Sequence, residues 1–188
     1  LFYNYAKKIN NKFSALGPRF LNVNKKSHRQ SDINLEISKI TSVHGSVFFL
    51  HKKTFKELKG FDENFFLYFE ETDFCKRAMK KNLPAYQLNN IKVKVTGRSV
   101  SIKNLQRKAN LQNLLSWHFI WSEFYFYKKH YGKTLSLIYF FPTLVRTIFK
   151  YLLNIILKKE SEFNKYKYRL NGLLSSMLEK KSKLRLKI

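Results

Sequence analysis

The chain has 188 residues, of which 44% are hydrophobic, and this is enough for one domain with a buried core and a substantial further segment. Lysine and arginine number 37 against 12 acidic residues, so the net charge of +25 favours polyanionic partners, whether nucleic acid, anionic lipid or phosphorylated substrates. The single cysteine, Cys75, excludes an internal disulfide and a cysteine-based metal site, and it suits a reducing compartment such as the cytoplasm.

The first third of the chain predicts a helix followed by strands. The chain starts with Leu1 and shows no signal-peptide pattern, so we expect it to be a fragment. The segment Leu1–Lys12 is typical of a helix, and Asn24–Asp32 is typical of a polar loop. Strand character extends over Ile37–Leu50, and its apolar end, Val47–Leu50, predicts a buried strand.

The middle of the chain predicts short helices and strands. Thr54–Leu58 favours a helical turn, which Gly60 can end in the left-handed conformation. A second helix is expected over Glu70–Lys81, because acidic residues occupy its first turn and basic residues its later turns. Two short strands are expected at Ala85–Leu88 and Ile91–Val95.

Long helices are expected beyond about Asn104, with a break near Gly132. We therefore predict two domains, 1–103 and 104–188, with a boundary near Lys103. The longest uncharged run in this half, Thr134–Val145, is well short of the roughly 20 residues that a spanning helix needs. The sequence therefore predicts no clean transmembrane helix.

The segment Gly60–Arg77, GFDENFFLYFEETDFCKR, closely resembles the signature of glycosyltransferase family 2, especially its rhamnosyltransferase-like members. Gly45-Ser46 upstream, Lys94–Ser99 downstream and the later helical segment up to Gly132 are similar to further parts of that family. The resemblance spans roughly 16–132. It implies an α/β fold, the C-terminal part of a GT-A type mixed-sheet domain followed by a helical basic arm, with the nucleotide-binding N-terminal half missing.

The resemblance also implies roles for particular residues in an inverting sugar transfer. The acceptor hydroxyl must lose a proton as it attacks the anomeric carbon, and the family's second acid, here Glu71, would be the general base. Glu70 and Asp73 would orient the helix start and the acceptor, and a cluster of aromatic residues at Phe65–Phe69 would partly exclude water. The expected substrate-binding residues are Gly45, Ser46, Arg98 and Ser99.

Two departures from the family pattern stand out, and alternatives remain open at several positions. Glu71 replaces the usual Asp, and Lys94 replaces a His, so position 94 cannot ligate a metal while protonated. Acids in a first helical turn also serve simply as partners of the helix dipole. Arg98 suits either phosphate binding or a solvated surface charge, and Arg77 is expected to pair with Asp73 at the i,i+4 spacing.

The resemblance implies a nucleotide-sugar donor, a glycan or lipid-linked acceptor, and a divalent metal, Mg²⁺ or Mn²⁺. The metal would be bound mainly by the missing half, because the sequence contains no D-x-D motif and offers no metal site of its own. We therefore expect this chain by itself to be inactive in sugar transfer.

The C-terminal half is basic and aromatic, with 17 basic residues against 4 acidic ones from Gln106 onward. In 142–158 a polar residue recurs every four positions among apolar residues; the polar positions are Arg146, Lys150, Asn154 and Lys158. This pattern favours burial of the helix at an anionic membrane surface, and packing on the catalytic domain is the alternative. We expect a cytoplasmic protein, peripheral at the inner face of the membrane. Nucleic acid is a less favoured partner, because many aromatics lie in contiguous apolar runs.

Overall fold

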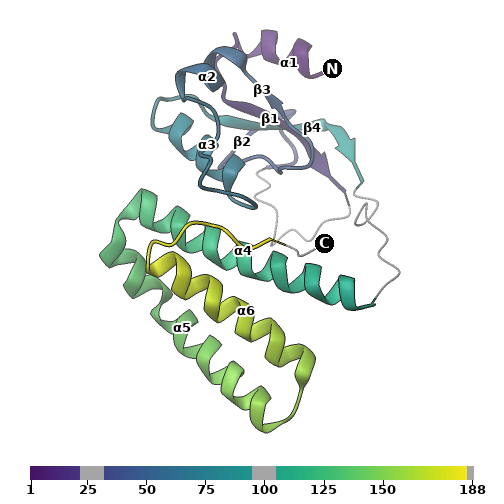
Figure 1. The fold of residues 1–188 in the computed structure, drawn as a ribbon. Coiled ribbons are helices and arrows are strands. Elements are labelled where there is room, and N and C mark those ends of the chain that lie inside the picture. Colours follow the sequence, from purple (N-terminus) through teal and green to yellow (C-terminus); the bar gives the residue numbers. More distant parts are fainter. Residues whose placement is uncertain (22–31, 95–104, 186–188) are drawn as a thin grey trace. The chain divides into compact units, whose positions relative to one another are not determined.

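The structure is a computed structural model that describes residues 1–21, 32–94 and 105–185 (Figure 1). By its internal contacts the chain divides into two compact units, and the first comprises Leu1–Asp62 and Glu70–Ser99. The second comprises Glu63–Phe69 and Val100–Ile188, so no single boundary along the chain separates the two. The described residues form a four-stranded mixed sheet and six helices, which confirms the α/β class.

The first unit is built on one mixed sheet with the strand order β2-β4-β1-β3. The central pair, β1 and β4, is parallel, whereas β2 and β3 are antiparallel to their neighbours at the two edges. The strands are β1 (Ala15–Phe20), β2 (Ile37–Ile40), β3 (Phe49–Leu50) and β4 (Ala85–Val93).

Each face of the sheet has its own apolar cluster, because successive strand residues point to opposite faces. Ala15 joins the cluster around Phe74 and Cys75 of helix α3 (Glu70–Met79), which also receives side chains from helix α2 (Lys52–Glu57). The next residue, Leu16, joins a second cluster with helix α1 (Phe2–Lys8). The sheet therefore holds α3, the helix that carries the predicted acids, on one of its two buried faces.

Strand β4 merges the two strands predicted from the sequence. Its pairing with β1 shifts register between Pro18 and Arg19, where Pro18 pairs with Leu88 and Arg19 with Lys92. Proline has no N–H for the ladder and is tolerated at such an irregularity. Asn89 lies in this irregular part, is 4% exposed, and donates from its Nδ2 to the carbonyl oxygen of Leu35 at 2.5 Å.

Three other predictions about the first unit need correction. The expected strand Ile37–Leu50 consists of two separate strands, and β3 is a half-buried edge strand rather than a buried one. Helix α1 ends at Lys8 rather than near residue 12, because Asn10 and Asn11 have φ of 53° and 54°, outside the helical region. The predicted left-handed Gly60 is confirmed, with φ of 72°.

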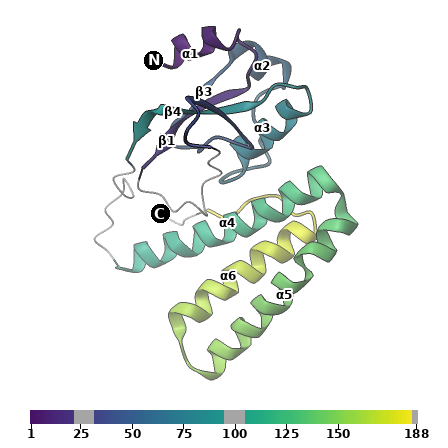
Figure 2. The same cartoon turned by 180° about the vertical axis from the view of Figure 1, so that it is seen from behind.

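The second unit contains a three-helix bundle of α4 (Leu105–Tyr131), α5 (Lys133–Ile156) and α6 (Glu160–Met177). The three helices lie side by side in opposite views (Figure 1, Figure 2). Their shared core is formed by Ile120, Phe124, Phe140 and Leu173. The predicted break at Gly132 is confirmed, since this residue has φ of 88° between α4 and α5.

Helix α5 is long and apolar enough to cross a membrane, although the sequence analysis expected no clean transmembrane helix. By length and composition, its 24 residues are one candidate membrane span among the described residues. The most apolar stretch of 18 residues has a mean hydropathy of 1.2, and 17% of it is buried. The helix extends beyond the uncharged run Thr134–Val145, since it continues past Arg146 and Lys150 without an acidic residue.

Candidate functional site

The predicted acids lie at the start of α3, which begins at Glu70. The two preceding residues, Tyr68 and Phe69, have φ of 67° and 70° and turn the chain into the helix. Left-handed conformations in two consecutive non-glycine residues each cost on the order of 1 kcal/mol. Such local strain is common where a protein must hold a functional side chain in place.

Glu71 lies beside the turn that contains Gly45 and Ser46. A Cβ atom placed on Gly45 would lie 3.5 Å from the carboxyl carbon and from Oε1 of Glu71. Both distances are ordinary van der Waals contacts, so the Glu71 carboxylate lies directly against this turn. The structure thus brings together two predicted site positions, Gly45 and Glu71, that lie far apart in the sequence.

Ser46 and His44 stiffen the same turn. The backbone N–H of Ser46 donates to Nδ1 of His44 at 3.2 Å, and the Ser46 hydroxyl lies 2.7 Å from the same nitrogen. The imidazole packs on Phe20 with ring centroids 4.8 Å apart. Partial withdrawal from water lowers the pKa of His44, which favours the neutral ring as hydrogen-bond acceptor.

Glu70 holds a carboxylate oxygen that lacks a hydrogen-bond donor. Its Oε2 atom is buried, and it is one of two buried side-chain polar atoms without a hydrogen-bond partner in the described part of the chain; the other is the hydroxyl of Ser14. An unsatisfied buried polar group costs on the order of 1–3 kcal/mol.

Asp73 does not share the surroundings of the other two acids, which corrects its predicted contact with an acceptor. Its side chain is fully buried, and its Oδ2 accepts from Nε of Arg77 at 2.7 Å. Arg77 also donates to the carbonyl oxygens of Leu58 and Gly60 at 2.6 and 2.7 Å. The predicted i,i+4 pair is confirmed, and it fastens α3 to the turn that follows α2.

The remaining predicted site positions contribute less to this picture. Arg98 and Ser99 lie outside the described residues, while Lys94 is exposed. Across 1–21, 32–94 and 105–185, no three His, Cys, Asp or Glu side chains gather as metal ligands. The described residues therefore contain no such ligand group for the divalent metal that the resemblance implies.

The aromatic segment 65–69 belongs to the second unit, where its rings pack on α4. Phe65 packs against Tyr125 with centroids 4.9 Å apart, and Phe69 packs against Phe126 at 5.4 Å. The hydroxyl of Ser122 donates to the carbonyl oxygen of Leu67 at 2.7 Å. The segment is therefore a packing element of the second unit, and its expected shielding of the acids from water stays a prediction.

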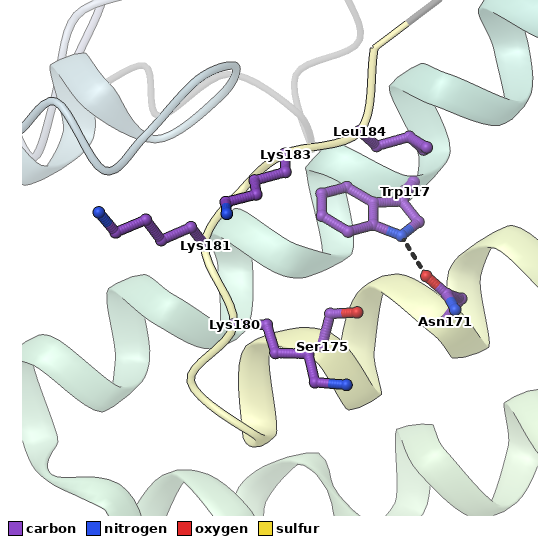
Figure 3. A pocket seen from close by; sticks show the side chains of 7 residues that line it. All are labelled: Trp117, Asn171, Ser175, Lys180, Lys181, Lys183 and Leu184. Carbon is purple, nitrogen blue, oxygen red and sulfur yellow. Dashed lines mark hydrogen bonds between the residues drawn. The ribbon is translucent and has the colours of Figure 1, made fainter.

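The second unit also contains an open cavity of about 610 Å³ against α4 and α6 (Figure 3). The indole N–H of Trp117 donates to Oδ1 of Asn171 at 2.8 Å, as the dashed line in Figure 3 marks. Lys180, Lys181 and Lys183, from the segment after α6, line the same cavity. The lining therefore combines an aromatic ring with cationic side chains.

Near this cavity a buried histidine, which the sequence did not single out for this role, fastens the C-terminal segment to α4. His118 is fully buried, with Nε2 2.9 Å from the carbonyl oxygen of Leu184 and Nδ1 2.9 Å from the hydroxyl of Ser182. Burial lowers the pKa of His118, with the nearby charge of Arg185 acting in the same direction. The geometry fits a neutral ring that donates from Nε2 and accepts at Nδ1.

Comparison with known proteins identifies no relative, since no family model, curated protein or solved structure matches this chain.

Proposed function

We propose that this chain contributes the acceptor-activating part of an inverting, GT-A type glycosyltransferase. The observation that carries the proposal is the grouping of Glu70 and Glu71 at the start of α3 beside the Gly45 turn, with one buried Glu70 oxygen lacking a donor. The resemblance of 60–77 to glycosyltransferase family 2 supports the same assignment.

In the proposed reaction Glu71 is the general base. Its carboxylate takes the proton of an acceptor hydroxyl as that oxygen forms a bond to the anomeric carbon of the donor sugar. The bond from this carbon to the nucleoside diphosphate breaks, and the diphosphate leaves with the electron pair from the opposite face, which inverts the configuration. General-base catalysis of this kind contributes about 10²–10⁴-fold in rate.

Glu70 would orient the acceptor rather than take its proton. A sugar carries several hydroxyl donors, and one of them can satisfy the buried Oε2 of Glu70 while another faces Glu71. Asp73 would act only through Arg77, by holding the start of α3 against the carbonyls of Leu58 and Gly60. It is therefore a positioning residue in this scheme.

The donor diphosphate and its divalent metal enter the proposal only as the resemblance implies them. A metal, where bound, would neutralise charge on the leaving diphosphate. The described residues do not form its ligand set, and neither proposed role of Glu70 or Glu71 depends on it.

The test is transfer of labelled sugar from a panel of nucleotide-sugars to glycan and lipid-linked acceptors, using the protein at its full encoded length. Replacing Glu71→Gln keeps the size of the side chain and removes the base, so kcat should fall by about 10²–10⁴-fold with little change in the KM for acceptor. Replacing Glu70→Gln should mainly raise the KM for acceptor, since it alters binding rather than proton removal.

A matched control is Glu57→Gln on α2, which removes an acid of the same sequence region that lies 4.0 Å from Lys53. It should leave both kinetic constants unchanged. A Glu71→Gln protein with wild-type kcat would refute the proposal, and it would favour a basic binding module without catalysis.

A further inference from the structure

Helix α5 presents an apolar surface to its surroundings although it belongs to a bundle. Six side chains, spaced three or four residues apart over five turns, are each at least half exposed. We call this stripe the α5 outer face; it consists of Ile138 (66% exposed), Phe141 (61%), Val145 (50%), Phe149 (60%), Leu152 (51%) and Ile156 (76%). A contiguous apolar surface of this kind marks an interaction site.

The opposite side of α5, which faces the bundle, is more polar than the outer face. Ser136, Thr147 and Asn154 are 1%, 4% and 6% exposed. Their side chains donate to carbonyl oxygens one turn earlier in the same helix, at 2.8, 2.7 and 2.6 Å. The predicted polar stripe is therefore wrong at Asn154, which points inward.

This arrangement reverses the usual pattern of a helix in water, which buries its apolar side and exposes its polar side. Because the inward polar groups are satisfied within the helix, none of them requires water. The bundle side of α5 is therefore already packed, with Phe140 in the shared core, whereas the outer side suits apolar surroundings such as the boundary between a bilayer's headgroups and acyl chains.

Charge selects a bilayer with anionic lipids over a second copy of the chain. The stretch from Phe124 through Lys159 contains no Asp or Glu, whereas it contains seven Lys or Arg side chains. Arg146, Lys158 and Lys159 on and after α5 are exposed. A second copy would bring the same basic region and the same +25 charge, which repel, whereas anionic headgroups attract each of these side chains.

The bundle favours a helix that lies in the membrane plane over one that crosses it. At 1.5 Å per residue the 24 residues of α5 would reach about 36 Å, enough to span. However, α6 packs along α5, and its stretch Glu160–Arg169 contains both signs of charge; the residues are Glu160, Glu162, Lys165, Lys167 and Arg169. Drawing these charges into hydrocarbon together with α5 is costly.

We propose that the α5 outer face inserts into the headgroup–acyl boundary of an anionic bilayer, with Arg146 and Lys158 contacting lipid phosphates. Aromatic and aliphatic side chains supply the insertion, and the basic residues supply the preference for anionic lipid. This surface does not depend on sugar transfer, so the two proposals succeed or fail separately.

The first test is flotation of the full chain with vesicles of phosphatidylcholine and about 30% phosphatidylglycerol, at about 0.1 M salt. The pair Phe141→Ser and Phe149→Ser should weaken partitioning by about 30-fold or more, since two largely exposed rings lose their insertion. The control pair, Ile33→Ser and Leu35→Ser, removes two exposed apolar side chains of the first unit and should bind as the wild type does. Equal loss in both pairs would overturn the assignment to α5.

The second test concerns charge. Arg146→Gln with Lys158→Gln should weaken binding to anionic vesicles by about 10- to 30-fold, at roughly fivefold for each basic residue near the surface. The control, Lys52→Gln with Lys53→Gln on α2, changes the net charge equally and should change binding by less than about threefold. Equal binding of the wild type to vesicles with and without phosphatidylglycerol would overturn the choice of an anionic partner.

A gain of signal tests the proposal without relying on loss of binding. Phe149→Trp places an indole on the α5 outer face, whereas the native Trp117 and Trp121 are 4% and 3% exposed. Vesicles with brominated acyl chains should quench the new fluorescence. The membrane assignment is wrong if the bound protein shows no quenching. It is also wrong if the double variant Phe141→Ser with Phe149→Ser converts a dimer to a monomer in sedimentation and leaves flotation with vesicles unchanged.

Discussion

The ion pair between Asp73 and Arg77 allows a quantitative test of how the first unit holds its acidic helix. The change is Arg77→Ala. In the structure the Asp73 side chain is 0% exposed and that of Arg77 20% exposed, and the guanidinium also binds the carbonyl oxygens of Leu58 and Gly60. Without Arg77 the Asp73 carboxylate remains buried and loses the ion-pair partner that lies 2.7 Å away.

The expected loss in the free energy of unfolding is about 3–5 kcal/mol, the usual effect of removing one partner of a buried ion pair. Domains of ordinary stability have about 5–15 kcal/mol, so this loss is a large share of the total. With an m value of about 2 kcal/mol per molar urea, the unfolding midpoint of the first unit should fall by about 1.5–2.5 M. The double variant Asp73→Asn with Arg77→Ala should recover part of the loss, since the buried charge is then gone.

The chain provides its own reporters for each unit. Its single cysteine, Cys75, is 1% exposed in α3, so its reaction with a thiol reagent across a urea series follows the opening of the first unit. Its two tryptophans both lie in α4, so their fluorescence follows the second unit. The control is Lys80→Ala, an exposed charge directly after α3, with an expected change within about 0.5 kcal/mol. Equal midpoints for Arg77→Ala and Lys80→Ala would refute the reasoning.

Two further predictions concern the bundle. Gly172→Ala should destabilise the second unit by about 1–3 kcal/mol despite alanine's higher helix propensity, because the new Cβ would lie 2.6 Å from the carbonyl oxygen of Trp117. Urea unfolding followed by tryptophan fluorescence measures this loss, with Lys167→Ala at an exposed position of the same helix as the control. Stability of the same unit should fall as pH drops below about 6.5, since His118 has a pKa lowered by burial and the unfolded chain takes up the proton first. His118→Gln should remove this part of the pH dependence, and an unchanged pH profile in that variant would contradict the assignment.

Local sequence rules predicted the elements whose boundaries depend on neighbouring residues. The start of α3 follows from its acidic first turn, the end of the preceding turn from Gly60, and the separation of α4 from α5 from Gly132. Strand β4 was predicted as two short strands on either side of Asn89 and Asn90. The structure instead accommodates an irregular pairing there, opposite Pro18, and this depends on a partner strand far away in the sequence.

The candidate site was predictable only in part, for the same reason. Gly45 and Glu71 were both selected from the resemblance, but only the folded chain shows that one lies beside the other. The buried oxygen of Glu70 and the full burial of Asp73 are results of packing, which residue spacing does not report. The inward side of α5 did leave a signal, because Ser136, Thr147 and Asn154 recur on one side of a helix that is otherwise apolar.

The distribution of charge explains why the net charge of +25 could not by itself locate the surface that meets a polyanion. Up to Leu105 the chain has 20 basic and 8 acidic residues, and beyond it 17 and 4, so both halves are strongly basic. The long-range attraction that such a net charge predicts toward a polyanion would therefore arise from both halves, and salt would weaken it by screening the charges. In the proposed membrane binding, insertion of the apolar α5 outer face should persist where screening removes the attraction, so this face would fix which side of the bundle meets the bilayer.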